Sequence, residues 1–180
     1  SGSTGNPKGA VFNESLLVPV GPITTIHPFV RLDFEPHDPT LALSLLQTVR
    51  CGGQRAIGQS LETVFSDFAA ARPTHIGATP ILWNSVHQEY LSRVQEEMKR
   101  LTGGDGPGPV AGGVGLQEQA EKKVKKEICK LVGNRCRVAS VGGAPVSDAV
   151  FAFVKDTMGI DIVKTYGTRE TGGITCDEVV

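Results

Sequence analysis

Residues 137–167, RVASVGGAPVSDAVFAFVKDTMGIDIVKTYG, decide the fold of this chain. Their pattern predicts a strand over 137–141, a glycine turn, a helix capped by Ser147, a second strand over 160–165 and a loop at Tyr166. Strands that alternate with helices pair in parallel, so the sequence predicts an α/β fold with a mostly parallel sheet flanked by helices. Ligands of such sheets bind beyond the carboxyl ends of the strands, which is where the turn and the loop would lie.

The preceding part of the chain alternates in the same way. Apolar residues at helical spacing predict helices over 40–49, from an N-cap at Ser60 to residue 72, over 81–101 and over 116–132, with a short buried strand over 74–79. The Gly/Pro-rich segment 103–115 has almost no side chain able to pack, and we interpret it as a flexible insertion. Residues 11–39 are poorly periodic, and only short apolar runs such as 16–20 are compatible with strands there.

Composition excludes several classes of protein. The chain has 180 residues, a formal net charge of -1 and a pI near 6.4, so it lacks the broad basic field that would attract nucleic acid or an anionic membrane. No apolar run approaches the ~20 residues of a transmembrane segment, and the N-terminus has no signal-peptide pattern. The cysteines have no zinc-ligand spacing, so we expect reduced thiols in an intracellular, cytoplasmic protein: Cys51, Cys129, Cys136 and Cys176.

Two groups of ionisable residues carry no function in this interpretation. The lysines between 122 and 126 alternate with glutamates, which indicates a solvated helix face with i,i+4 pairs rather than a phosphate-binding patch. The histidines have neither metal-ligand nor triad spacing, and we expect them to be structural or exposed: His27, His37, His75 and His87.

The opening residues 1–9, SGSTGNPKG, have the ingredients of a phosphate cradle. Glycines let backbone N–H groups approach phosphate oxygens, hydroxyls donate further hydrogen bonds, and a lysine supplies a mobile positive charge. The run is not a Walker loop, because its lysine follows a proline and no Ser or Thr directly follows the lysine. Two further glycine-bearing segments come later in the chain: Gly142-Gly143-Ala144-Pro145 and Tyr166-Gly167-Thr168-Arg169-Glu170-Thr171-Gly172.

These three segments, in this order, resemble the motifs of the adenylate-forming (AMP-binding) superfamily. Its members include acyl-CoA synthetases, carboxylic acid reductases, luciferases and the adenylation domains of peptide synthetases. Residues 71–83, ARPTHIGATPILW, look like the segment behind the acyl site of long-chain acyl-CoA synthetases and carboxylic acid reductases, although we interpret Trp83 itself as a core residue. Since the chain begins without Met inside the first motif, we expect residues 1–180 to be a partial AMP-binding domain, truncated at both ends.

The resemblance implies a role for each matching residue. Phosphate binding would fall to Ser3, Thr4, Gly5 and Lys8. Tyr166 would stack on adenine, with Gly167 and Thr168 following it in the same loop, while Gly143, Ala144 and Pro145 would border the base and the acyl group. Glu170 is the candidate ligand for Mg²⁺, which prefers oxygen ligands. Arg169 would lie beside the α-phosphate.

The activity that the resemblance implies is ATP-dependent activation of a carboxylic acid, with a fatty or aryl acid favoured, to an acyl-adenylate. The acyl group would then pass to coenzyme A or to the phosphopantetheine of a carrier protein. Charge neutralisation and positioning accelerate such a reaction without a protein nucleophile. The family places a ribose-binding aspartate, a hinge and an adenylate-contacting lysine beyond Val180, so we expect this segment to be inactive without the rest of its parent chain, including a C-terminal lid domain.

Two positions depart from the family pattern. Arg169 stands where relatives have a threonine near the α-phosphate, and Pro39 aligns with a histidine beside the acyl site, for which His37 is a substitute only if the loop shifts. Two alternatives to a ligase of the acyl-CoA synthetase or carboxylic acid reductase type stay open, and the departures support the first of them. One is a divergent nucleotide-binding module without catalysis, and the other is an adenylation domain that loads a carrier protein.

Overall fold

The computed structural model of the chain describes residues 30–33, 41–50, 52–58, 60, 62–103, 113–168 and 172–176. Its strands form one six-stranded sheet in the order β2-β1-β3-β4-β5-β6. Five neighbouring strands pair in parallel, and β6 runs antiparallel to β5, which confirms the predicted fold class. The strands are β1 (Val30–Asp33), β2 (Gln54–Ile57), β3 (His75–Ala78), β4 (Val138–Val141), β5 (Asp161–Thr168) and β6 (Gly172–Cys176).

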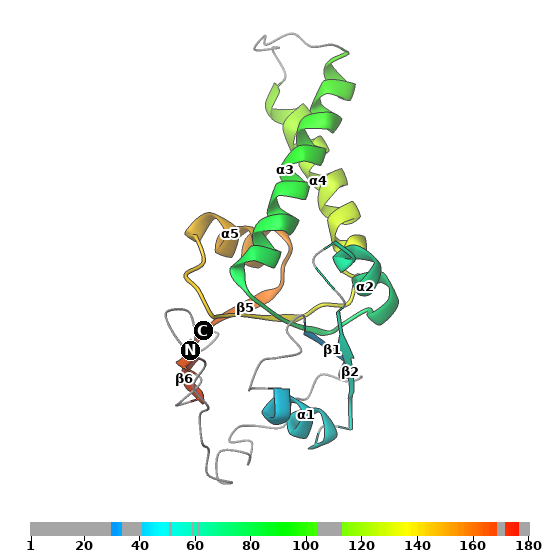
Figure 1. The fold of residues 1–180 in the computed structure, drawn as a ribbon. Coiled ribbons are helices and arrows are strands. Elements are labelled where there is room, and N and C mark those ends of the chain that lie inside the picture. Colours follow the sequence, from blue (N-terminus) through cyan, green and yellow to red (C-terminus); the bar gives the residue numbers. More distant parts are fainter. Residues whose placement is uncertain are drawn as a thin grey trace.

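The helices lie on both faces of this sheet because the strand order reverses. After β1 the chain steps outward to β2, then returns past β1 to β3 and continues in that direction. Since β-helix-β crossovers are almost always right-handed, such a reversal moves the later helices to the opposite face. Figure 1 shows α1 on one side of the sheet and α2 to α5 on the other. The helices are α1 (Leu41–Arg50), α2 (Val64–Ala71), α3 (Pro80–Thr102), α4 (Gly113–Leu131), α5 (Asp148–Ala152) and the π-helical turn η2 (Phe153–Thr157).

The core lies between the sheet and α2 to α5. Leu32, Ile76, Ala139 and Ile162 are paired across four neighbouring strands, and each is at most 5% exposed. Because side chains alternate along a strand, this row presents one apolar face to the helices. The helices complete the core with fully buried side chains, among them Phe68, Trp83, Val86, Val124, Ile128 and Val154.

Trp83 confirms its interpretation as a core residue, since none of its surface is exposed. Its indole Nε1 is buried without a hydrogen-bond partner. A buried donor that gives up its bond to water lowers stability, so the packing of the indole ring must outweigh this cost.

Most of the predicted helices are confirmed within a few residues. The helix predicted over 40–49 is α1, and Gly52, with φ of 60°, ends it by donating to the Val49 carbonyl at 3.0 Å. The helix predicted over 81–101 is α3, and the strand predicted over 74–79 is β3. Helix α4 begins at Gly113 instead of the predicted 116, and residues 104–112 lie outside the described part of the chain.

The N-cap prediction at Ser60 is wrong. Helix α2 begins at Val64, so its N-cap is Thr63, and Thr63 makes no side-chain capping bond. Ser60 instead accepts hydrogen bonds at its Oγ from the amides of Glu62 (3.2 Å) and Thr63 (3.3 Å). A serine hydroxyl accepts hydrogen bonds from the amides of a turn as readily as from those of a helix N-terminus, so the residue type alone did not distinguish a turn from a helix start.

The predicted loop at Tyr166 is also wrong. Strand β5 continues to Thr168 because its second half pairs with β6 in an antiparallel ribbon. The strands β1, β2 and β6 have only four or five residues each, and the sequence pattern predicted none of them. The positions of β1 and β2 depend on pairing with strands beyond an intervening helix, and that of β6 depends on its antiparallel pairing with β5, rather than on local periodicity.

Helices α3 and α4 form a long hairpin that projects from the sheet (Figure 1). Gly133 follows the C-terminus of α4, at the sheet end of this hairpin. Gly133 has φ of 85°, and the amide of the next residue, Asn134, donates to the Cys129 carbonyl at 2.8 Å. A Cβ at Gly133 would lie 2.9 Å from the Phe68 carbonyl oxygen and 2.9 Å from the Arg72 Cα. These contacts are with backbone atoms, which have little freedom to move away.

We therefore predict that Gly133→Ala lowers the free energy of unfolding by more than about 3 kcal/mol, since it combines a strained backbone with a clash. Gly159→Ala is the matched control: its φ is 71°, but a Cβ there meets nothing within 4 Å. This control should cost only about 1 kcal/mol for the left-handed backbone. Urea denaturation of the two variants measures both values, and equal losses would show that the contact with α2 is unimportant.

Candidate functional site

The carboxyl ends of three neighbouring strands bring the described site residues together. Ala78 of β3 pairs with Val141 of β4, and Val141 pairs with Lys164 of β5. Because these strands are parallel, the segments that follow these residues meet at one edge of the sheet. The turn Gly142-Gly143-Ala144-Pro145 and Tyr166 therefore lie at the edge where sequence analysis expected a ligand.

Gly142 lies in direct contact with β5. A Cβ at Gly142 would be 2.9 Å from the Thr165 carbonyl oxygen and closer still to the Thr165 hydroxyl. The Thr165 hydroxyl donates a hydrogen bond to the Val141 carbonyl at 3.2 Å. Only glycine allows the turn to approach the strand this closely.

The next residues of the turn face open space. Gly143 has φ of 80°, and a Cβ there would have the Thr79 methyl, at 3.8 Å, as its nearest neighbour. Ala144 and Pro145 are exposed, and Tyr166 is 61% exposed, which is unusual for a large aromatic side chain. An exposed ring beside a turn with little side-chain bulk provides a surface on which a flat aromatic group can stack.

Short-range contacts fix the start of α5 after the turn. The Ser147 Oγ accepts from the Val150 amide at 3.4 Å, which confirms the predicted N-cap. Lys164 lies 4.5 Å from the ring centre of Phe151 and 3.9 Å from the carboxylate of Asp148. Asp148 is fully exposed, so the cation–π contact holds α5 against β5 more effectively than the ion pair does.

The remaining predicted site residues are outside the described part of the chain. They are Ser3, Thr4, Gly5 and Lys8 of the phosphate cradle, Arg169 and Glu170, together with His37 and Pro39. Gly167 and Thr168 are described as part of β5. The meeting of the phosphate cradle with the carboxyl edge thus stays a prediction.

Sequence analysis missed two threonines at this edge. Thr79 directly follows β3 and contacts the position of Gly143, and Thr165 contacts Gly142. Both residues were the last of a predicted strand, so their position at the carboxyl edge was the signal that would have found them.

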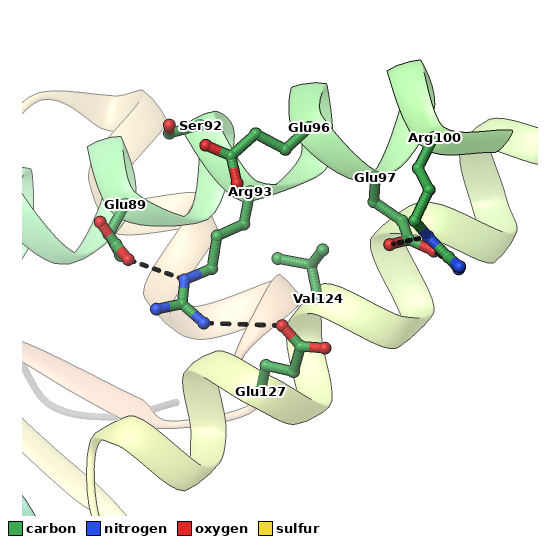
Figure 2. A pocket seen from close by; sticks show the side chains of 8 residues that line it. All are labelled: Glu89, Ser92, Arg93, Glu96, Glu97, Arg100, Val124 and Glu127. Atoms are coloured by element: carbon green, nitrogen blue, oxygen red, sulfur yellow. Dashed lines mark hydrogen bonds and ion pairs between the residues drawn. The ribbon is translucent and has the colours of Figure 1, made fainter. Parts of the chain in front are cut away.

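A second concave region lies away from this edge, between α3 and α4. Figure 2 shows this groove, with a volume of about 460 Å³, lined by charged side chains. Arg93 bonds to Glu89 at 2.7 Å on its own helix and reaches Glu127 of α4 at 3.5 Å. Charges that neutralise one another across two helices indicate a structural contact. The lining residues are Glu89, Ser92, Arg93, Glu96, Glu97, Arg100, Val124 and Glu127.

Glu97 is the central acid of this groove. Hydrogen bonds from Arg100 at 2.6 Å and Lys123 at 2.7 Å lower the pKa of Glu97 to about 2. Glu97 is only 9% exposed, and it lines the groove beside these two cations. Lys123 is one of the lysines that the sequence placed on a solvated helix face, and it is exposed. Its ion pair with Glu97 of α3 is a tertiary contact, which the pattern within one helix cannot predict.

We predict a specific pH dependence for Glu97→Gln. A lowered pKa stabilises the folded state above the ordinary pKa of glutamate, near 4.5, and this contribution disappears as pH falls towards 2. The variant should therefore unfold at lower urea concentration than the wild type at pH 7, and the difference should shrink between pH 4.5 and pH 2. Glu96→Gln is the control, because Glu96 lines the same groove without an ion pair among the described residues. A difference that stays constant with pH would contradict this prediction.

The other titratable groups do not suggest a nucleophile. Burial raises the pKa of the Cys136 thiol to about 12 and also raises that of Cys129, so both remain protonated at neutral pH. Burial, with a smaller effect of Arg31, lowers the pKa of His75 to about 4. Within the described ranges, no group of three or more His, Cys, Asp or Glu side chains is arranged to hold a metal ion. No helix in the same ranges has the length and apolar character to cross a membrane.

Comparison with known families covers nearly the whole chain. The family described as AMP-binding enzyme matches residues 1–179. The chain belongs to this family. The AMP-binding match agrees with the geometry above, in which an exposed tyrosine and a glycine turn share the carboxyl edge of a parallel sheet.

Relatives of this AMP-binding chain are much longer proteins. A carboxylic acid reductase from Mycobacterium marinum is 30% identical over 100% of this chain and 15% of its own length. Long-chain-fatty-acid–CoA ligase 5 from Mus musculus is 26% identical over 96% of this chain and 28% of its own length. The chain thus spans less than a third of either relative.

Solved structures of carboxylic acid reductase adenylation domains are also similar to this chain. The adenylation domain of a carboxylate reductase from Mycobacterium chelonae is 30% identical and matches with a TM-score of 0.77, covering 98% of this chain and 27% of that domain. The A-PCP didomain of the carboxylic acid reductase from Segniliparus rugosus, in complex with AMP, is 27% identical with a TM-score of 0.63. It covers 82% of this chain and 19% of the didomain.

Proposed function

We propose that the protein carrying this domain uses ATP to convert a carboxylic acid into an acyl-adenylate. The observation that carries the proposal is the convergence of Thr79, the Gly142 turn and Tyr166 at one edge of the sheet, in a chain of the AMP-binding enzyme family. Gly143, Ala144 and Pro145 border the base and the acyl group, and the exposed Tyr166 ring stacks on adenine. The described edge fits this task, because it offers flat, largely uncharged surface.

In this proposal the acid's carboxylate oxygen attacks the α-phosphorus of ATP. A new oxygen–phosphorus bond forms, the bond to the β-phosphate bridging oxygen breaks, and pyrophosphate leaves with the electron pair. Ser3, Thr4, Gly5 and Lys8 hold the departing phosphates, and the Arg169 guanidinium neutralises charge at the α-phosphate. Glu170 would hold Mg²⁺, which would supply further charge neutralisation. These assignments rest on the sequence motifs.

The first test is acid-dependent exchange of labelled pyrophosphate into ATP, measured with the full-length protein and with fatty and aryl acids. Tyr166→Ala should raise the KM for ATP about tenfold or more, because it removes the ring that stacks on the base. Tyr166→Phe keeps the ring and should stay within about twofold of wild type. Since Tyr166 is largely exposed, neither change should unfold the protein.

An unchanged KM in Tyr166→Ala would contradict the stacking role. Absence of exchange with every acid, alongside retained ATP binding, would instead favour a nucleotide-binding module without catalysis. Arg169 in place of a threonine, and Pro39 in place of a histidine, are the sequence observations on which that second possibility rests.

The proposal also concerns which thiol receives the acyl group from the acyl-adenylate. The ligase relative supports coenzyme A, whereas the reductase relatives support the phosphopantetheine of a carrier domain, since one of them is described as an A-PCP didomain. We favour the carrier domain, because the higher identities and coverage belong to the reductases. Incubation with ATP, acid and either coenzyme A or a phosphopantetheinylated carrier should give thioester only on the carrier. Thioester formed on coenzyme A at equal rate would overturn this preference.

A further inference from the structure

Thr165 lies where β5 changes its pairing partner. Lys164 is the last residue of β5 that pairs in parallel with β4, and Thr165 is the first that pairs with β6, opposite Cys176. The ribbon that follows contains an irregularity of register between Tyr166 and Gly167. Irregularities of this kind redirect the side chains beside them, so the direction of the Tyr166 ring depends on how this segment of β5 is fixed.

The contacts of Thr165 connect this segment to the glycine turn. Its hydroxyl donates to the Val141 carbonyl at 3.2 Å, directly before the turn, and its own carbonyl oxygen and hydroxyl lie where a Cβ at Gly142 would be. At the next residue, the Thr79 methyl is the nearest group to a Cβ built at Gly143, at 3.8 Å. The close contact that fixes the turn is therefore the one with Thr165.

Core packing does not explain why residue 165 is a threonine. The residue is exposed, and valine has almost the same shape and suits a strand equally well. The hydroxyl is what distinguishes threonine here, because without it the Val141 carbonyl loses the donor that ties β4 to β5 beyond their last ladder pair.

We propose that Thr165 is a positioning residue, which fixes the Gly142 turn relative to Tyr166 through its hydroxyl. The inference rests on the proposed function, in which these two elements bind the two sides of the adenosine and acyl site. Thr165 touches neither ATP nor the acid in this scheme. It determines whether the two surfaces that do so are correctly spaced before the nucleotide arrives.

The test compares Thr165→Val, which removes the hydroxyl and keeps the shape, with Thr165→Ser, which keeps the hydroxyl. In pyrophosphate exchange with the full-length protein, Thr165→Val should raise the KM for ATP about three- to tenfold while kcat changes less, and Thr165→Ser should stay within about twofold of wild type. A purely structural role predicts lower melting temperatures without a change in KM at temperatures well below melting.

Amide hydrogen exchange gives a readout that needs no nucleotide. Thr165→Val should speed exchange at residues 142–146 and 166–168, Thr165→Ser should not, and the amides of residues 150–154 should be unaffected in both. If the wild type lacks pyrophosphate exchange, the proposed function fails, while this contrast still decides whether the hydroxyl holds the turn. Wild-type KM or wild-type protection in Thr165→Val, or a failure of Thr165→Ser to restore them, would overturn the inference.

Discussion

The close approach of Gly142 to Thr165 is the contact on which the carboxyl edge of this domain depends. A Cβ at residue 142 would overlap both the hydroxyl and the backbone of Thr165, so no other residue type lets the turn lie against β5. The position of this turn determines the distance of Gly143 from Thr79 and the point at which Ser147 caps α5. Backbone atoms make most of this contact, and they relax far less readily than side chains, which makes the geometry specific.

The charged groove lies in the helical hairpin of α3 and α4 and is lined by none of the residues of this edge. The hairpin of α3 and α4 buries apolar side chains between its helices and the sheet, such as Val86, Val124 and Ile128, and carries ion pairs beside them, such as that of Glu97 with Lys123. Ion pairs that remain in contact with solvent contribute little stability individually, so the buried apolar side chains contribute most of the stability of the hairpin. Because the groove shares no residues with the carboxyl edge, changes in the two regions should be energetically additive.

The sequence predicted the parts of the fold that have local causes. Long helices such as α3 repeat an apolar side chain every turn, and Gly52, Gly159 and Ser147 carry conformational preferences that act over a few residues. Strands β3 and β4 lie between clear helix and turn signals, whereas β1 and β2 have no such local signal and are defined by their pairing, β2 with β1 and β1 with β3. Contacts between residues far apart in the chain also leave no local pattern that could predict them. Examples are Lys123 with Glu97, 26 residues apart, and Thr165 with Val141, 24 residues apart.

The composition of the carboxyl edge divides the proposed chemistry into two parts. Gly143, Ala144 and Pro145 have no ionisable side chain and Tyr166 offers an aromatic ring, so these residues can hold a base or an acyl chain but cannot neutralise a triphosphate. Transfer at the α-phosphorus needs positive charge close to the developing negative charge, and Lys164 of the described edge is engaged with Phe151 and Asp148. The charge must therefore come from other segments, and the sequence offers Lys8 and Arg169, with Mg²⁺ at Glu170. Binding of the adenosine and chemistry at the phosphate thus belong to different segments of the chain, and a defect in one need not abolish the other.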